Sequence, residues 1–224
     1  MGKRFDSYRS NWARVGAVGA MALGGVSVLA LTRKKPGSVR ALAVMNSITM
    51  QAHQYEEYVD PGYMAGETNS ALFHSDHPEN WPLNAQGLMC ANWGFSALHL
   101  LPVLAPKVKW LTLPPAVLGI AQAVAHGVIM PLRTRKVYNP GALTSTLLHV
   151  PIGIASIRAI RAEGPITRGD WAKSVGVLAL FFAAGVVMPN ALYADRNSPY
   201  LLSEKQLGRP EVVASASKNR KRRR

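Results

Sequence analysis

The five residues His53-Gln-Tyr-Glu-Glu57 place one imidazole and two carboxylates at the end of a long apolar stretch. At 3.6 residues per turn, His53 and Glu57 share one helical face, and Glu56 lies beside them. Asn46 and Thr49 continue that face backwards along the same stretch. Lipid offers no hydrogen bonds, so such a polar stripe must face other protein. We therefore predict a functional site at this position.

Two kinds of chemistry suit this group of residues. In the first, two histidines and one or two glutamates bind a divalent metal, zinc or iron. In the second, Glu56 or Glu57 acts without a metal as general acid or base and His53 orients it, as in an isomerase or cyclase that works on a lipid precursor. The metalloprotease helix motif is excluded, because it requires a second histidine where this chain has Glu57.

Apolar residues gather in six windows of the chain, whereas Lys and Arg collect between the windows. This segregation is typical of polytopic helical membrane proteins and differs from the charge-lined outer faces of soluble helices. We therefore predict an all-α transmembrane helical bundle of about six spans. The expected spans are residues 15–31, 41–59, 89–106, 110–132, 142–157 and 174–193.

The chain divides into a basic N-terminal segment (1–14), the bundle (15–193) and a basic tail (194–224). Residues 203–224 have too little apolar periodicity to offset their ordering entropy, so we expect the tail to be disordered and residues 203–224 to be dispensable. The net charge is +14, but the basic residues form short clusters beside apolar windows and do not form one basic face that could bind a nucleic-acid groove. This pattern argues against nucleic-acid binding and predicts contact with anionic lipid headgroups.

The predicted topology follows from the loops. The longest loop, residues 60–88, contains no Lys or Arg, and more basic residues fall on the side of the two termini than on the other side. The positive-inside rule then predicts an integral membrane protein with both termini in the cytosol. The loop is expected on the same side as the termini. Cys90 is the single cysteine, so no intrachain disulfide can form.

Six crossings would bring several polar groups to one end of the bundle. Spans two, four and six would deliver His53, His126 and Asn190 there, and the 138–144 turn would join them. With a rise of 1.5 Å per residue, His53 and His126 then lie at a similar depth. The candidate catalytic residues are His53, Glu56, Glu57 and His126, and the candidate metal ligands are His53, Glu57 and His126.

Simpler interpretations stay open for each of these groups. Glu56 and Glu57 could be ordinary charges at a helix end, and His126 could make a helix-to-helix hydrogen bond. Structural roles are favoured for His99 and His149, which have no nearby acid in the sequence. The segment His74-Ser-Asp-His77 is interpreted as a surface loop.

The pattern His53-Gln-Tyr-Glu-Glu57, a central His126 and the turn Tyr138-Asn-Pro-Gly-Ala-Leu-Thr144 resembles the integral membrane family named after its HXXEE motif. The resemblance covers roughly residues 41–193. It implies a polytopic helical bundle of uncharacterised activity and draws attention to the same histidines and glutamates. This chain has Gln122 where members of the family carry Asn or a similar residue.

Three functions fit the pattern. The first is an enzyme that acts on a lipophilic, lipid-like or isoprenoid-like substrate. The second is a structural or assembly protein, and the third is a small transporter or proton relay. A transporter is expected to show internal repeats or paired broken helices, with its polar groups at the midplane. The polar groups here cluster at one end without a repeat, which favours the enzyme.

Overall fold

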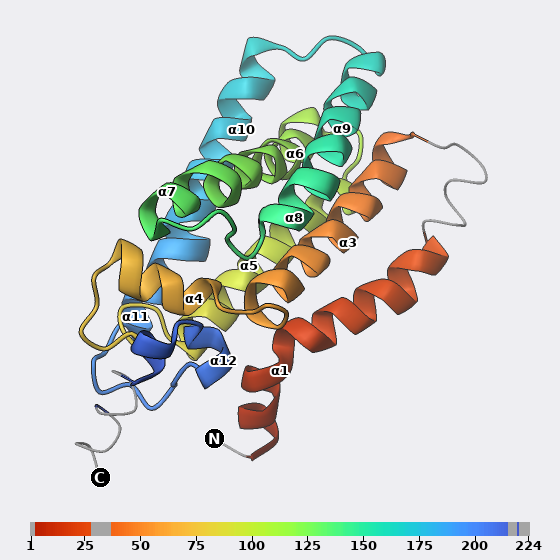
Figure 1. Cartoon of the computed structure of the whole chain (residues 1–224). Helices are drawn as coiled ribbons and strands as arrows, with labels where there is room; N and C mark the ends of the chain where they lie inside the picture. The colour runs from red at the N-terminus through yellow and green to blue at the C-terminus, as the bar shows by residue number, and fades with distance from the viewer. Residues whose placement is uncertain (1–2, 28–36, 215–218, 220–224) are drawn as a thin grey trace.

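The computed structural model describes residues 3–27, 37–214 and 219, and its regular structure within these residues is entirely helical (Figure 1). Five long helical segments form the body, and α3 packs on α5 and α9, while α6 packs on α9 and α10. The segments are α3 (Val39–Tyr58); α5 (Ala85–Leu104); α6 (Lys109–Val124) with η3 (Ala125–Ile129) and α7 (Met130–Thr134); α8 (Ala142–Thr144) with η4 (Ser145–His149) and α9 (Val150–Ala162); and α10 (Arg168–Leu180) with η5 (Phe181–Val187) and α11 (Met188–Tyr193).

Four of these segments, within the described residues, are long and apolar enough to cross a membrane: Ala85–Leu104, Lys109–Thr134, Ala142–Ala162 and Arg168–Tyr193. The sequence predicted about six spans. The predicted span 41–59 is a helix, α3, but its polar stripe keeps it outside this group of four. The predicted span 15–31 lies partly in α1 (Lys3–Gly19) and η1 (Ala20–Gly24), and residues 28–31 lie outside the described part. A helical bundle of membrane type is therefore confirmed, with four clear candidate spans.

Three of the segments widen into a π-helical turn just before a proline. The turn η3 precedes Pro131, η4 precedes Pro151 and η5 precedes Pro189. A proline has no N–H to donate and its ring clashes with the carbonyl one turn earlier, so the helix must adjust there. Wider π-type turns are a common form of this adjustment and occur often at functional sites. Two of the turns carry a buried histidine, His126 in η3 and His149 in η4.

One end of the bundle is covered by the 60–84 loop, the tail and α1. The loop contains α4 (Met64–Glu67) and η2 (Thr68–Leu72), and the tail contains α12 (Glu204–Leu207). The Leu202 N–H donates to the Glu79 carbonyl, and the Asn80 side chain donates to the carbonyl of Ser198, which ties tail and loop together. In Figure 1, α4, α12 and the start of α1 lie at the same end of the bundle.

The prediction that the whole tail is disordered is wrong for residues 194–214. Leu202, Leu207 and Val212 are buried in an apolar cluster that also contains Trp12 and Tyr58. The sequence argument failed because these apolar residues are too widely spaced to give a periodic pattern, yet each meets a cluster supplied by other elements. Residues 215–218 and 220–224 lie outside the described part of the chain.

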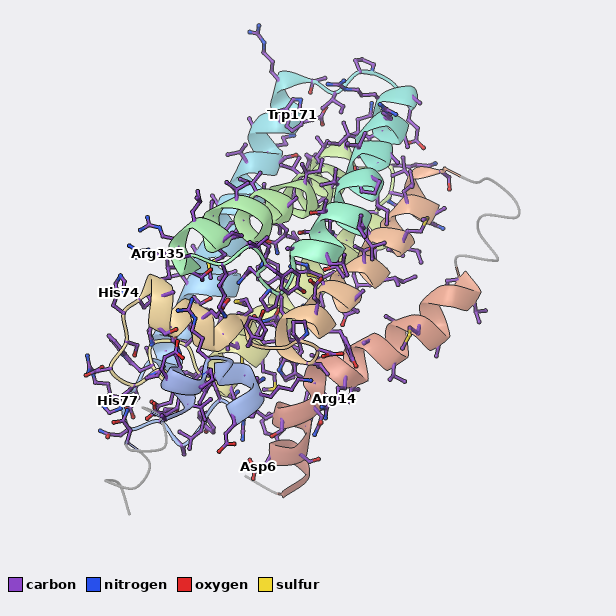
Figure 2. The ribbon with its side chains drawn as sticks, viewed as in Figure 1. Asp6, Arg14, His74, His77, Arg135 and Trp171 are labelled. Atoms are coloured by element: carbon purple, nitrogen blue, oxygen red, sulfur yellow. The ribbon has the colours of Figure 1, made fainter. Side chains whose placement is uncertain are left out.

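The buried apolar cluster at the opposite end of the bundle is smaller. Val39, Leu113 and Ile160 are buried together there, with Trp171 packed against them. Figure 2 shows Trp171 far from Asp6 and His77, which belong to the other end. The side chain of Thr167 accepts from the Asp170 N–H and the Asp170 carboxylate accepts in return, so α10 begins with a capping box at this end.

Candidate functional site

The carboxylate of Glu57 lies at the centre of the polar groups that the bundle buries. Its Oε1 atom is 3.6 Å from His53 Nε2 and 3.2 Å from His126 Nε2. His53 precedes Glu57 by one turn of α3, and His126 comes from the π-helical turn η3. The exposed fractions are 0%, 6% and 6% for His53, Glu57 and His126. The predicted approach of these three residues is therefore present in the structure.

Glu56 points in a different direction, toward the 138–144 turn. Its carboxylate accepts hydrogen bonds from the Tyr138 hydroxyl (2.6 Å), the Leu143 N–H (3.1 Å) and the Thr144 N–H (2.8 Å). It also accepts from the Thr144 hydroxyl at 2.5 Å. Burial and the bond to Glu56 raise the pKa of Tyr138 above its ordinary value, so the phenol stays protonated and donates. With four donors, Glu56 anchors the turn and has no free oxygen for chemistry.

The Thr144 hydroxyl links Glu56 to His53 and fixes the tautomer of the imidazole. Its single proton goes to Glu56, so its oxygen can only accept from His53 Nδ1, which lies 2.9 Å away. His53 therefore carries its proton on Nδ1 and a lone pair on Nε2. That Nε2 atom is buried without a hydrogen-bond partner and faces Glu57.

A second chain of contacts fixes His126 in the same way. His126 Nδ1 lies 2.7 Å from Asn139 Oδ1, and Asn139 Nδ2 donates to the Glu67 carboxylate at 3.1 Å. Because the amide nitrogen faces a carboxylate, the amide oxygen must face His126 and accept from its Nδ1–H. Lys136 at 2.5 Å and Arg209 at 3.7 Å hold Glu67 in turn. Neutral His126 therefore also presents the Nε2 lone pair to Glu57.

Three electron-rich atoms thus meet in one buried place. The ligand atoms of His53, Glu57 and His126 all lie within 4.8 Å of one another. Two imidazole lone pairs and a carboxylate oxygen repel one another unless a cation lies between them. Metal-bound histidines commonly donate their other N–H to a carboxylate, a carbonyl or a similar acceptor, as both histidines do here. The arrangement suits a metal ion or an added proton.

Gly141 allows the turn to approach both imidazole rings. Its φ angle is +101°, a conformation that other residues rarely adopt. A Cβ atom there would come within 2.7 Å of His126 Nδ1 and 2.8 Å of His53 Cε1. The Tyr138–Thr144 turn can therefore hold both histidines only with glycine at this position.

A cavity of about 310 Å³ adjoins the cluster. Glu57 and His126 form part of its wall, together with Asn190, whose Oδ1 is buried without a partner. Most of the remaining wall is apolar and comes from Met50, Leu88, Phe95, Met130 and Val186 among others. The volume is near the lower end of the ~300–1,000 Å³ typical of small-molecule sites.

The other residues that the sequence singled out are distributed as follows. Thr144 and the 138–139 pair lie in the site, whereas Asn92 and Asn190 line the cavity. His74 is exposed, as a surface loop requires, and Figure 2 shows His74 and His77 at the outer margin of the molecule. The sequence analysis missed Glu67, Lys136 and Arg209, because only the folded chain brings the loop and the tail to Asn139.

Comparison with known proteins gives one match. The family model described as "Protein of unknown function with HXXEE motif" matches residues 44–156, which is half of the chain. The matched region contains His53, Glu57, His126 and the 138–144 turn, and it ends before α10. No curated protein and no solved structure matches the chain.

Proposed function

This chain belongs to the family of proteins of unknown function with the HXXEE motif, and we propose that it is an integral membrane enzyme with one divalent metal ion. His53, Glu57 and His126 hold the ion, and the substrate is lipophilic. One observation carries the proposal. The two Nε2 lone pairs converge on one oxygen of Glu57 at the wall of an apolar cavity.

A metal ion accounts for the contacts better than a proton does. A proton placed on His126 would pair it with Glu57 but leave His53 Nε2 buried without a partner. A buried polar atom without a partner costs about 1–3 kcal/mol. One metal ion satisfies both nitrogens and the carboxylate together. The tautomers set by Thr144 and Asn139 leave both Nε2 atoms free to bind it.

Two imidazoles and one carboxylate suit zinc or iron. Three protein ligands leave a coordination position open, as in catalytic sites. A metal ion there would polarise a substrate oxygen or activate a water molecule. Glu56 does not take part directly, because its oxygens are already bound by four donors; it positions Thr144 and, through it, His53.

The cavity supports a lipophilic substrate. Its wall is largely apolar, and Glu57, His126 and Asn190 are among the few polar residues that line it, with Thr68, Asn92 and Gln122. Such a cavity buries a hydrocarbon body and orients a single polar group toward the cluster. A lipid or isoprenoid-like molecule carrying one oxygen function matches this distribution.

The membrane placement completes the proposal. None of the most apolar window of Arg168–Tyr193 is buried, and Val175, Leu180 and Val187 are exposed on it. A surface of this kind is stable against lipid. We propose that α3 and the 15–31 segment cross as well, which gives six spans with both termini in the cytosol. The basic residues then contact anionic headgroups.

Metal analysis of the purified protein tests the centre. After loading with Zn²⁺ and desalting, wild type should retain one equivalent and Glu57→Gln should retain none. His74→Gln is the matched control, because His74 is an exposed histidine of the loop. Helix content and thermal unfolding establish that each variant is folded. Equal zinc in wild type and Glu57→Gln would end the proposal.

Lipid retention tests the substrate class. Ala125→Phe fills the cavity beside His126, whereas Ala121→Phe lies one turn earlier on an exposed face. Mass spectrometry of the lipids that copurify should find one species enriched in wild type and Ala121→Phe and lost in Ala125→Phe. If the two variants retain the same lipids as wild type, the cavity does not bind a lipid, and a structural role becomes the better interpretation.

A further inference from the structure

Two more buried histidines, His149 and His99, lie near His53. The ring of His149 is 5.2 Å from the ring of His53, and the ring of His99 is 5.9 Å from that of His149, measured between centroids. The exposed fractions of His99 and His149 are 1% and 0%. Both lie within candidate membrane spans, where polar residues are rare and usually functional.

Each of these imidazoles has at least one buried ring nitrogen without a hydrogen-bond partner. His99 Nδ1 lies 2.8 Å from the Phe95 carbonyl and must donate to it, so the lone pair of His99 is on Nε2. That Nε2 atom is buried without a partner, and so are both nitrogens of His149. Buried side-chain nitrogens are paired in the large majority of cases, and each exception requires an explanation. Here three unpaired nitrogens belong to two neighbouring rings.

Neighbouring helices pack closely around the two histidines. The Ser47 hydroxyl donates to the His99 carbonyl at 2.7 Å and so joins α3 to α5. Gly119 lets α6 approach His149, because a Cβ atom at that position would come within 2.7 Å of His149 Nδ1. The pair is therefore a fixed arrangement between helices and not a flexible surface feature.

The charge around this pair differs from that around Glu57. Among the described residues, the histidines in ion pairs are His53, His77 and His126. His99 and His149 thus offer neutral nitrogens without a carboxylate. The cost of burying an ion grows with the square of its charge, so a divalent ion without a counter-charge is strongly disfavoured in a membrane interior. A monovalent ion that binds imidazole well is disfavoured much less.

We propose that His99 and His149 form a second metal site, which binds Cu⁺ through His99 Nε2 and one nitrogen of His149. Copper is among the metals that imidazole ligands suit, and Cu⁺ carries the single charge that this neutral pocket tolerates. The site uses other residues and another ion than the Glu57 centre. It neither requires nor supports zinc at that centre.

The experiment loads the purified full-length protein with Cu⁺ under reducing conditions and measures copper after desalting. A Cys90→Ser background removes the free thiol, which would otherwise bind copper. This background should retain Cu⁺, and the additional pair His99→Leu and His149→Leu should lower the retained copper by one equivalent. Leucine is chosen because an apolar side chain in place of an unpaired polar one preserves stability. Thermal unfolding without metal should show the leucine variant at least as stable as its parent.

Two further variants keep the test decisive. Gly119→Ala retains every ligand, but its Cβ atom would clash with His149. It should therefore weaken Cu⁺ binding at least tenfold without changing Zn²⁺ binding. Glu57→Gln should lose Zn²⁺ and keep Cu⁺. The proposal is overturned if the parent binds no copper, or if copper is unchanged in the leucine variant, which would mean that the copper binds elsewhere in the protein. Loss of copper in Glu57→Gln would overturn it too, by showing a single shared centre. The zinc content of these variants tests the Glu57 centre, and the copper content tests the second site, so the two proposals can fail separately.

Discussion

Glu56 and Glu57 are adjacent in the last turn of α3, and the fold uses them in opposite ways. Both are almost fully buried, with exposed fractions of 5% and 6%. Glu56 accepts from four donors of the 138–144 turn. Glu57 meets the Nε2 atoms of His53 and His126, and the tautomers of both rings direct lone pairs toward it.

The contrast teaches that burial alone does not identify the reactive carboxylate. An anion with all its oxygens bonded is a stable structural element, as Glu56 is for the turn. An anion that faces lone pairs needs an added cation, as Glu57 does. The two acids of the motif therefore depend on each other: Glu56 orients Thr144 and His53, and this orientation prepares the ligand set of Glu57.

Truncation after Leu202 should have the largest effect. It tests whether the tail stabilises the bundle and the residues that hold His126 beside Glu57. It removes the buried Leu207 and Val212 and also Arg209, a partner of Glu67. Loss of two buried aliphatic side chains costs about 3 kcal/mol or more. Thermal unfolding should show severe destabilisation, while truncation after Ala214, which removes the exposed bond of Asn219 to the Asp76 carbonyl, should lower the unfolding temperature only slightly and leave the zinc content unchanged. Equal stability of the two truncations would contradict the packing of the tail.

Replacement of each acid by glutamine tests the contrast directly. Glu56→Gln puts an amide among four donors and should cost about 3 kcal/mol, because hydrogen bonds to a charged group are lost and one donor loses its acceptor. Glu57→Gln removes a buried charge that faces lone pairs, so the metal-free protein should be as stable as wild type or more stable. Denaturant unfolding of both variants measures the difference. The contrast fails if Glu57→Gln is the more destabilised of the two.

Gly141→Ala should disturb both the turn that Glu56 anchors and the two histidines that face Glu57. We expect an intermediate loss of stability. Its Cβ atom would press on His126 and His53, and its φ angle of +101° is unfavourable for alanine. We expect a cost of about 2 kcal/mol from the backbone strain, together with loss of zinc. Gly169→Ala is the control, because a Cβ atom there meets only Thr167 Oγ1 at 3.6 Å. Full zinc retention in Gly141→Ala would mean that the rings are not held by the turn.

The sequence was sufficient to predict the helical bundle and the meeting of His53, Glu57 and His126. The i, i+4 spacing of His53 and Glu57 predicts that they share a face, and the similar depth of His126 predicts that it lies beside them. The different roles of Glu56 and Glu57 could not be predicted, because they depend on where the 138–144 turn places its donors. The buried Glu67 could not be predicted either, since its partners Lys136 and Arg209 come from distant segments. The packed tail was missed because its few apolar residues have no periodicity of their own.

Tyr138→Phe should have the smallest effect, because it removes one of the four donors to Glu56 and leaves the other three. We expect a loss of about 1 kcal/mol in unfolding free energy and unchanged zinc content, since Thr144 still orients His53. The pKa of Tyr138 is raised in the folded protein, so the contribution of its hydrogen bond is fully present below the unfolded value of about 10 and is lost as the pH rises further. Denaturant unfolding at pH 6, 7, 8 and 9 should therefore give the same difference between wild type and Tyr138→Phe. A difference that disappears as the pH falls toward 6 would show that Glu56 takes up a proton there, and the distinction between the two acids would then not hold.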